Sequence, residues 1–391
     1  MTKSSYDSLG VSASKAGLHK TLSQAGLSVD PALFSPVVED IAGSSEHFSF
    51  IHCDGAGTKS IVAYLYYRET GDPSLFSHLA QDALVMNLDD IFCIGLPENL
   101  VLANAIGRNS QLISDELIGL IISRYRELTK QLNTLGIPLT MSGGETADCG
   151  DVVRTLLVDA VVMGRLRKKH LISTKNIAAG DCIVGLSSSG KASYEESENS
   201  GIGSNGLTLA RHALINKTTA GKYPEVCDPS LDSSVTYRGR FNLSDSPEDL
   251  GMNIGQALAS PTRTYAPILA KVYAELGKQV HAAIHLTGGG QTKVLRFGDK
   301  LHFIKDSLFS PPTLFKLIQE SGSVAAREMF QVFNMGHRME LYLPEKEAVT
   351  VCSIAKDFNV EAKVVGRVEK SDSDKNELTI KHQGETHHYT L

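Results

Sequence analysis

Short apolar runs alternate with longer amphipathic stretches in the first half of the chain. Residues 48–52 and 99–103 read as strands, because apolar side chains gather there over a few consecutive positions. In residues 115–132 the apolar side chains instead recur at every third and fourth position, which is the spacing of one helix face. The pattern predicts strands mixed with helices.

The second half repeats this mixture. Strands are predicted at 182–186, 280–286, 339–343 and 360–368, and helices at 264–276 and 346–358. No repeat of solenoid period occurs along the chain. We therefore predict a protein of the α/β or α+β class.

The length of 391 residues predicts two domains, since single hydrophobic cores stop growing at roughly 250–300 residues. The apolar pattern breaks at the basic stretch 165–170 and in the polar turn that follows it. We place the linker near residues 168–176. It joins an N-terminal domain of residues 1–170 to a C-terminal domain of residues 175–391.

Composition narrows the classes of partner. The chain has 42% apolar and 21% charged residues and a formal net charge of −6, so nucleic acid and anionic membranes are not expected as partners. Residues 1–5 do not open an apolar signal segment, and no window approaches the ~20 apolar residues of a membrane span, so a cytoplasmic location is expected. Six scattered cysteines without zinc-type spacing predict reduced, mostly buried thiols.

A glycine-rich turn, Asp-Gly-Ala-Gly-Thr-Lys, follows the first predicted strand at residues 54–59. Glycines allow backbone amides to approach an anion closely, and Lys59 would add a positive charge. The spacing is not that of a Walker A sequence. An ordinary turn is the alternative that these residues leave open.

Carboxylates stand at two other places in the N-terminal half. Asp89 and Asp90 end an amphipathic helix and point to different sides, so either could hold Mg²⁺ but not both together. Residues 142–148, Ser-Gly-Gly-Glu-Thr-Ala-Asp, leave a predicted strand as a turn. This turn suits a metal-linked nucleotide site, because carboxylates need a cation between themselves and phosphates. A solvated helix end and a surface turn are the alternatives.

The C-terminal half carries hydroxyl and glycine motifs that suit an anion. They are Ser-Ser-Ser-Gly at 187–190, Gly-Ser-Asn-Gly at 203–206, Ser-Pro-Thr-Arg at 260–263, the strand and glycine nest at 281–290, and Phe-Asn-Met-Gly at 333–336. Hydroxyl groups and free backbone amides at the start of a helix favour binding of an anion. Helix capping alone would also explain each of these residues taken singly. His285 precedes the glycine nest directly, so a site role and a core role are equally compatible with its position.

In this order the motifs resemble the aminoimidazole ribonucleotide synthetase family over nearly the whole chain. Residues 54–59 match its Asp-Gly-Val-Gly-Thr-Lys motif, residues 89–91 its Asn-Asp-Leu motif, and residues 143–148 its Gly-Gly-Glu-Thr-Ala-Glu turn. Ser-Ser-Gly with Ser-Asn-Gly, Pro-Thr-Arg, His-x-Thr-Gly-Gly-Gly and Phe-Asn-x-Gly are matched as well. The opening residues 6–11 are similar to its Tyr-x-x-Ala-Gly-Val.

The resemblance implies two mixed α/β domains and a homodimer joined through the N-terminal sheets. It implies a phosphoribosylformylglycinamidine cyclo-ligase of purine biosynthesis, which converts formylglycinamidine ribonucleotide and ATP to aminoimidazole ribonucleotide, ADP and phosphate, with Mg²⁺ as cofactor.

The resemblance also assigns roles to residues. The catalytic residues would be Lys59 on the transferring phosphoryl group, Asp90, and His285 in proton transfer during cyclisation. The nucleotide would be bound by Asp54, Gly55, Gly57, Thr58, Gly143, Gly144, Glu145 and Thr146, with Asp54, Asp90 and Glu145 on Mg²⁺. The ribonucleotide would be bound by Ser189, Asn205, Thr287, Gly288 and Gly289.

The chain also departs from the family pattern. The glycine-rich loop that usually precedes residues 54–59 is reduced to residues 42–45, and an insert with three glutamates lies in residues 189–204. Asp89 stands where the family has an asparagine, and His337 and Arg338 stand where it has small residues. The roles of residues 187–205 and of the polar stretch 222–251 stay open. Thiamine-monophosphate kinases and other enzymes of the superfamily share the ATP-binding half, and a non-catalytic nucleotide-binding partner is a further alternative.

Overall fold

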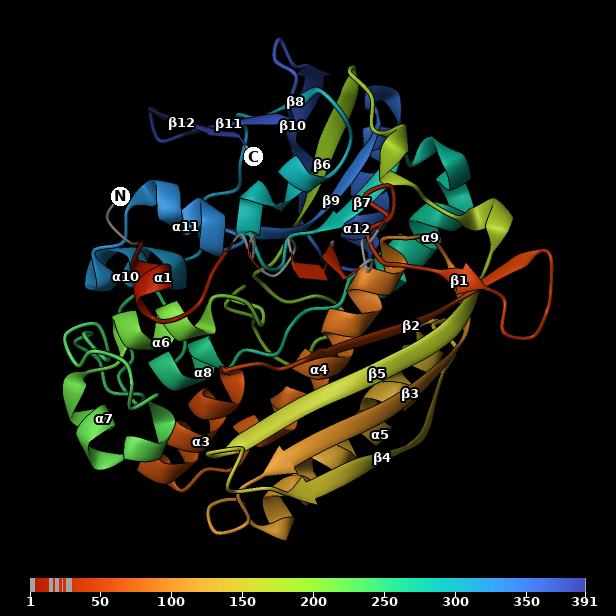
Figure 1. The fold of residues 1–391 in the computed structure, drawn as a ribbon. Helices are drawn as coiled ribbons and strands as arrows, with labels where there is room; N and C mark the ends of the chain where they lie inside the picture. The colour runs from red at the N-terminus through yellow and green to blue at the C-terminus, as the bar shows by residue number, and fades with distance from the viewer. Residues whose placement is uncertain (1–3, 14–16, 18–20, 23, 26–29, 391) are drawn as a thin grey trace.

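The computed structural model describes residues 4–13, 17, 21–22, 24–25 and 30–390 (Figure 1). Residues 1–3, where the predicted N-terminal domain begins, lie outside the described residues. The chain is built on a five-stranded sheet followed by a seven-stranded sheet. This confirms the predicted α/β class.

The first sheet has the strand order β1-β2-β5-β3-β4, with β3 and β4 parallel and the other neighbours antiparallel. Its strands are β1 (Val38–Glu39), β2 (His47–Gly55), β3 (Pro97–Arg108), β4 (Leu139–Asp148) and β5 (Leu156–Arg167). The accompanying helices are α1 (Ser5–Ser8), α3 (Lys59–Thr70), α4 (Leu75–Phe92) and α5 (Asp115–Thr134). Helices α4 and α5 lie behind this sheet in Figure 1, and no helix of the described residues covers the face toward the viewer.

Helix α4 differs from the prediction of an amphipathic helix. Every residue of α4 except Ser77 and His78 is buried. The helix contacts the first sheet, α3, α5 and the C-terminal helix α9, so no side of it is left to solvent. Polar residues on α4 are therefore buried and must find partners, which makes this helix a platform for a polar site.

The second sheet has the order β12-β11-β8-β10-β6-β9-β7. Its strands are β6 (Asp181–Ser187), β7 (Ala282–His285), β8 (Leu301–Lys305), β9 (His337–Pro344), β10 (Ala362–Lys370), β11 (Glu377–His382) and β12 (Glu385–Thr390). Its helices are α6 (Leu207–Leu214), α7 (Lys217–Lys222), α8 (Ile254–Leu258), α9 (Ala266–Leu276), α10 (Thr313–Gly322), α11 (Ala326–Val332) and α12 (Ala348–Asp357). The predicted strands and helices of this half all fall on these elements.

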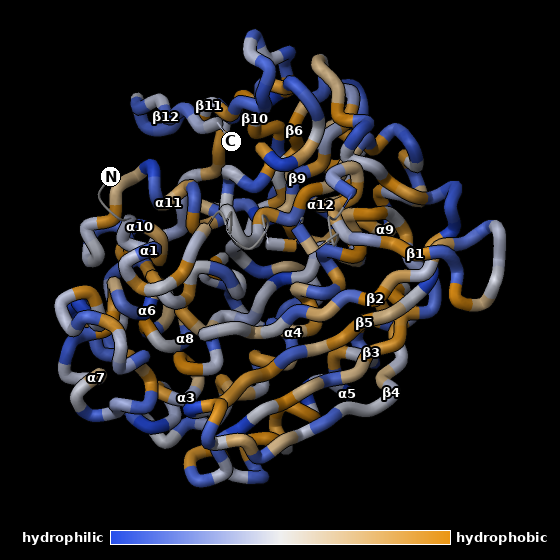
Figure 2. Tube along the Cα trace, in the orientation of Figure 1, coloured by the Kyte–Doolittle hydropathy of each residue, from blue (hydrophilic) through white to orange (hydrophobic). Residues whose placement is uncertain are grey.

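The two sheets are joined by short 3₁₀ turns at Lys168–His170 and Thr174–Asn176. The buried apolar residues of both halves form one continuous cluster. The apolar segments of α4 and of the first sheet, orange in Figure 2, form a large part of it. Polar side chains of α4 consequently meet residues of the second half inside the molecule rather than at its surface.

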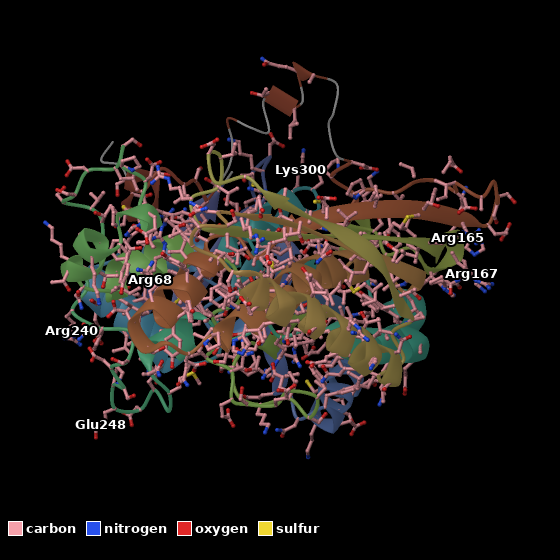
Figure 3. All side chains as sticks on the ribbon, turned by 90° about the horizontal axis from the view of Figure 1, so that it is seen from below. Arg68, Arg165, Arg167, Arg240, Glu248 and Lys300 are labelled. Atoms are coloured by element: carbon pink, nitrogen blue, oxygen red, sulfur yellow. The ribbon has the colours of Figure 1, made fainter. Side chains whose placement is uncertain are left out.

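Both long polar stretches are fixed by side-chain contacts. In residues 187–205, Glu195 pairs with Arg263 at 2.5 Å, and both side chains are almost fully buried. In residues 222–251, Glu225 accepts a hydrogen bond of 2.5 Å from the hydroxyl of Tyr64 on α3. Figure 3 shows Arg240 and Glu248 of that stretch at the molecular surface.

All six cysteines are free, but only Cys93 and Cys182 are buried, so the prediction of mostly buried thiols is wrong. Cys53 is exposed because it lies on the uncovered face of β2. Among the described residues, no helix is both long and apolar enough to cross a membrane.

Candidate active site

A cavity of about 340 Å³ lies where the two halves meet. It is lined by the first residues of the chain, the end of β2, the last turns of α4, the start of α6 and the segment after β7. The lining residues are Tyr6, Ser12, Ala13, Asp54, Met86, Asp90, Asn205, Gly206, Thr287, Gly288, Gly289, Lys293, Arg296 and Val332. Six residues predicted from the sequence are among them.

The N-terminal half of the chain contributes two carboxylates, Asp54 and Asp90, to the wall of this cavity. Burial and the neighbouring Asp90 raise the pKa of Asp54. Burial alone would also raise the pKa of Asp90, but Lys293 and the hydrogen bonds from His285 and His52 outweigh it and hold this pKa below its ordinary value. Asp90 is therefore an anion at neutral pH, in a cavity where a second carboxylate lies close by.

His285 contacts Asp90 from outside the cavity wall. Its Nδ1 lies 2.6 Å from Asp90 Oδ1, and its Nε2 lies 3.1 Å from Nε of Arg338, which can only donate. These partners assign the neutral ring with its proton on Nδ1. Burial lowers the pKa of His285 to about 4, which agrees with a neutral ring. His285 is fully buried and is not part of the cavity wall, so it contacts Asp90 rather than a ligand.

The neighbouring Asp89 faces away from the cavity, as expected for adjacent residues of a helix. Its Oδ1 accepts hydrogen bonds from the Thr264 hydroxyl at 2.8 Å and from the Tyr265 backbone at 3.0 Å. Its Oδ2 is buried without a hydrogen-bond donor among the described residues, 3.6 Å from a nitrogen of Arg338. Burial raises the pKa of Asp89 to about 7.

Another part of the cavity wall is formed by the glycine nest after β7. Thr287, Gly288 and Gly289 line it, and Gly289 has φ +101°, a backbone conformation that favours glycine. Among the described residues, the N–H groups of Gly288 and Gly289 donate to no protein acceptor. Free amides in a nest are suited to an anion.

Asn205 and Gly206 close the cavity from the start of α6. The amide oxygen of Asn205 has no hydrogen-bond partner among the described residues although it is buried. Gly206 has φ +76°, and a Cβ there would lie 2.4 Å from the ring of Phe333. Only glycine fits this turn, which holds Asn205 toward the cavity with an unpaired amide.

The structure does not bring Lys59 into this cavity. Its side chain is fully buried, and its Nζ donates to Asp82 at 2.7 Å, to the carbonyl oxygen of Gly203 at 3.1 Å and to that of Ser260. An ammonium group has three N–H donors, so all of them are in use. In this conformation Lys59 joins the two halves of the chain, and the predicted contact with a phosphoryl group would require it to leave these partners.

The residues around Lys59 are also structural in this conformation. A Cβ at Gly55 would lie 1.8 Å from Oδ1 of Asp159, and Gly57 has φ +56°. The Thr58 hydroxyl is 3.0 Å from that of Thr208 on α6. Glycine is thus required at position 55 by the packing of β2 on β5, independently of any ligand.

The predicted turn at 142–148 is wrong, because these residues continue strand β4 to Asp148. Gly143, Gly144, Glu145 and Thr146 pair in parallel with β3 and are exposed. Two strands separate β4 from β2, which places the two strands about 14 Å apart. Glu145 therefore does not meet Asp54 and Asp90 within the described chain, and no group of three potential metal ligands occurs among the described residues.

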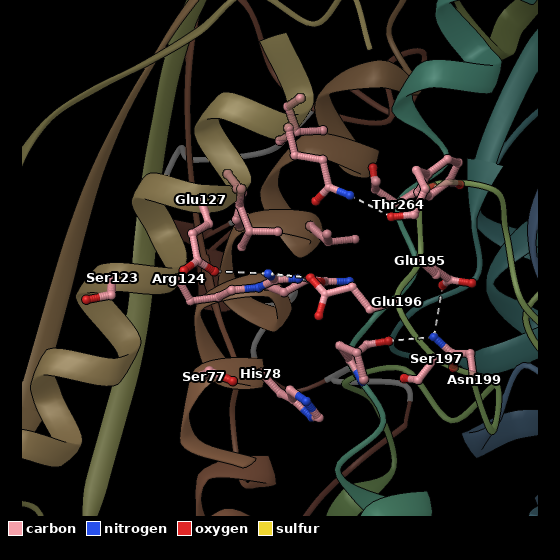
Figure 4. Close-up of a pocket in the computed structure, with 18 of the residues that line it drawn as sticks. Ser77, His78, Ser123, Arg124, Glu127, Glu195, Glu196, Ser197, Asn199 and Thr264 are labelled. Carbon is pink, nitrogen blue, oxygen red and sulfur yellow. Dashed lines mark hydrogen bonds and ion pairs between the residues drawn. The ribbon is translucent and has the colours of Figure 1, made fainter. Parts of the chain in front are cut away.

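Ser189 also lies outside the cavity wall. Its carbonyl oxygen accepts a hydrogen bond of 2.9 Å from Arg263, whose guanidinium group also pairs with Glu195. This segment lies beside a second cavity of about 250 Å³ between α4, α5 and residues 194–199 (Figure 4). There Arg124 pairs with Glu127 at 3.1 Å and with Glu196 at 2.8 Å, which attaches the insert to α5.

Sequence reasoning missed Lys293 and Arg296, which line the main cavity. Both lie on the 3₁₀ helix Gly290–Arg296 that follows the glycine nest. Two basic residues three positions apart, the first of them three residues after a glycine run, were a visible feature of the sequence. Nothing in the local pattern distinguishes them from exposed surface residues, since only the fold turns this segment toward Asp54 and Asp90.

Two family models match the chain. The model described as AIR synthase related protein, N-terminal domain, matches residues 32–166, and the corresponding C-terminal domain matches residues 178–378. The chain is 30% identical over 324 residues to a phosphoribosylformylglycinamidine cyclo-ligase of Methanocaldococcus jannaschii, which covers 83% of this chain and 79% of that protein. A protein of the same name from Methanococcus vannielii is 28% identical over 326 residues, covering 83% and 78%.

Solved structures with a similar fold include a thiamine monophosphate kinase from Aquifex aeolicus, with a TM-score of 0.53, 11% identity and coverage of 93% of this chain and 99% of that one. PurL from Thermotoga maritima complexed with ATP gives a TM-score of 0.50 at 12% identity, over 91% of this chain and 45% of that one. The chain thus spans about half the length of PurL. Identities this low show a common fold only.

Proposed function

The chain belongs to the AIR synthase related family, and we propose that it is a phosphoribosylformylglycinamidine cyclo-ligase. In this reaction ATP phosphorylates the formyl oxygen of formylglycinamidine ribonucleotide, the amidine nitrogen closes the imidazole ring, and phosphate leaves. The products are aminoimidazole ribonucleotide, ADP and phosphate. The observation that carries the proposal is one cavity whose described wall includes both carboxylates of one half and the glycine nest of the other.

Asp54 and Asp90 fit the cation that such chemistry needs. Mg²⁺ is usually held by one or two carboxylates together with phosphates and water, and these two carboxylates share one wall of the cavity. When bound, Mg²⁺ would neutralise charge on the phosphates of ATP. Lys293 and the hydrogen bonds from His285 and His52 keep Asp90 ionised, and the two histidines also orient its carboxylate.

His285 is better placed to position Asp90 than to exchange protons with a ligand. Its two ring nitrogens are occupied by Asp90 and Arg338, and its side chain is not exposed to the cavity. We therefore propose that His285 acts through Asp90, which departs from the proton-transfer role expected from the sequence. Replacement of His285 should accordingly weaken the response to Mg²⁺ more than it shifts the pH profile.

The free amides of Gly288 and Gly289 and the unpaired side chain of Asn205 would receive polar groups of the substrates. Removal of one aimed donor or charge from a site of this kind typically costs about 10²–10³ in rate. Asp90→Asn should retain the wild-type Tm within a few degrees and lose turnover by that factor. Wild-type turnover in this variant would remove Asp90 from the mechanism.

The direct test of function is a coupled assay for ADP formation. Formylglycinamidine ribonucleotide and thiamine monophosphate are offered separately to the full-length protein with ATP and Mg²⁺. ADP that appears with the first compound, together with aminoimidazole ribonucleotide, is the expected result. ADP formation with thiamine monophosphate alone would instead support a kinase, and ADP formation with neither would support a non-catalytic nucleotide-binding protein.

We further propose a cytoplasmic homodimer joined through the first sheet. The face of this sheet without helices exposes Ile51 to 66% and Leu157 to 41%, an unusual exposure for large apolar residues in strands. Light scattering of the wild type should show a dimer at micromolar concentration, and Ile51→Asp should shift it toward the monomer; a monomeric wild type would refute the dimer.

A further inference from the structure

One lysine among the described residues reaches the main cavity, and it is Lys293 rather than Lys59. The Lys293 ammonium group donates a hydrogen bond to the hydroxyl of Thr287. It also lies 4.4 Å from the ring centroid of Phe34. No carboxylate of the described residues lies within ion-pair distance of it, so Lys293 keeps N–H donors that no protein acceptor uses.

The electrostatic surroundings of Lys293 differ in kind from those of Lys59. Lys59 has a carboxylate at 2.7 Å and no exposed surface. Lys293 instead has Asp90 and Asp54 at longer range. Burial lowers the pKa of Lys293, and these two carboxylates offset only part of that effect. A positive charge is thus held next to two negative ones without being neutralised by direct contact.

A phosphoryl group bound in this cavity needs a positive charge beside it, and Lys293 can supply one. Without a cation, a phosphate beside Asp54 and Asp90 would be repelled by both carboxylates. Lys293 lines the same cavity as these carboxylates and as Gly288 and Gly289, and a lysine binds phosphate as a compact point charge. Thr287 and Phe34 hold its side chain before any ligand arrives, which reduces the entropy lost on binding.

We propose that Lys293 is the lysine that contacts a phosphoryl group of the bound substrates, in the role that the sequence suggested for Lys59. The proposal rests on the proposed function for the identity of the substrates. It needs no covalent bond to Lys293 and no proton transfer from it: the ammonium group donates hydrogen bonds and balances charge. The phosphoryl group can belong to ATP or to the ribonucleotide, and the experiment distinguishes the two.

The test compares three variants of the full-length protein. Lys293→Met keeps the unbranched stem that packs near Phe34 and removes the charge, whereas Lys293→Arg keeps a charge. Lys300→Ala is the control, because Lys300 is 55% exposed and pairs with Asp374 at the surface. Thermal unfolding of each variant first shows that the fold is intact. Equilibrium binding is then measured for ATP with Mg²⁺ and, separately, for ribose 5-phosphate, followed by turnover with both substrates.

We expect Lys293→Met to lose about 10²–10³ in kcat/KM, with partial recovery in Lys293→Arg and no change in Lys300→Ala. A tenfold or larger loss of ATP binding places the nucleotide phosphates at Lys293, and a similar loss of ribose 5-phosphate binding places the ribonucleotide phosphate there. Unchanged binding of both probes overturns the proposal. The binding measurements need no cyclisation, so they remain decisive even if the proposed reaction is not observed.

Discussion

Replacement of Lys59 by methionine separates a structural lysine from a catalytic one. In the wild type, Lys59 and Asp82 form an ion pair of 2.7 Å with both side chains fully buried. Oδ1 of Asp82 also accepts hydrogen bonds from the backbone and hydroxyl of Thr262, at 2.9 and 2.5 Å. Methionine fills the space of the lysine stem but leaves the Asp82 carboxylate buried without its cation.

The expected cost follows from that stranded charge. Removal of one partner of a buried ion pair typically destabilises a protein by about 3–5 kcal/mol. For a domain of 150–250 residues, each kcal/mol lowers Tm by about 2–4 °C, so Tm should fall by roughly 6–20 °C. The second substitution Asp82→Asn should restore more than half of this loss, because an uncharged amide is cheaper to bury and its oxygen can still accept from Thr262.

Thermal unfolding followed by circular dichroism suits this experiment, since the chain contains no tryptophan to report by fluorescence. Turnover is measured below the transition, where the variants are folded. A structural role for Lys59 is refuted if Lys59→Met unfolds within about 2 °C of the wild type while its turnover falls by about 10²–10³, because that combination indicates a lost substrate contact. Lys59 would then be the catalytic lysine.

Three further substitutions test other buried features. The change in Tm caused by Asp89→Asn should be more favourable at pH 8 than at pH 5, because a folded pKa of about 7, above the unfolded value, makes the wild type lose stability as the pH rises through this range; an equal change at both pH values would contradict this. Burial lowers the pKa of His212 to about 2. The free energy of unfolding of the wild type should therefore fall by about 2 kcal/mol between pH 7.5 and 5, because the unfolded chain binds this proton and the folded chain does not. His212→Asn should remove that loss. If the Tm of this variant depended on pH in the same way as the Tm of the wild type, His212 would not be the cause of the loss. Gly206→Ala should lower the free energy of unfolding by about 1–3 kcal/mol, because the new Cβ strains the backbone and contacts Phe333. The control Gly221→Ala should not lower it, because the space around Gly221 is open. Equal urea midpoints of the two variants would refute the clash.

The sequence alone determined the features that depend on neighbours along the chain. Apolar spacing located the helix at 115–132 and the strands at 48–52 and 182–186, because side-chain periodicity follows directly from backbone geometry. The order of the motifs indicated the family, which the family models confirm. It also selected Asp54, Asp90 and the glycines after His285, all of which border or support one cavity in the structure.

The tertiary structure decided which of the charged residues are available to a ligand. Lys59 and Lys293 both lie near glycine runs, and no local pattern shows that one is enclosed by Asp82 and two carbonyl groups while the other faces a cavity. The same holds for Glu145, whose segment has the composition of a turn but pairs along β3 as an edge strand. Local composition specifies the backbone only weakly where long-range strand pairing competes with it.

What the chain by itself fixed is therefore the family, the alternation of its elements and the types of group that its chemistry needs. What only the fold fixed is the division of those groups between structure and site. The physical reason is desolvation: a buried charge must be paired by whichever residues the fold places around it, as Asp82 pairs Lys59. A charge that lines a cavity between the two halves, such as Lys293, keeps donors for a ligand.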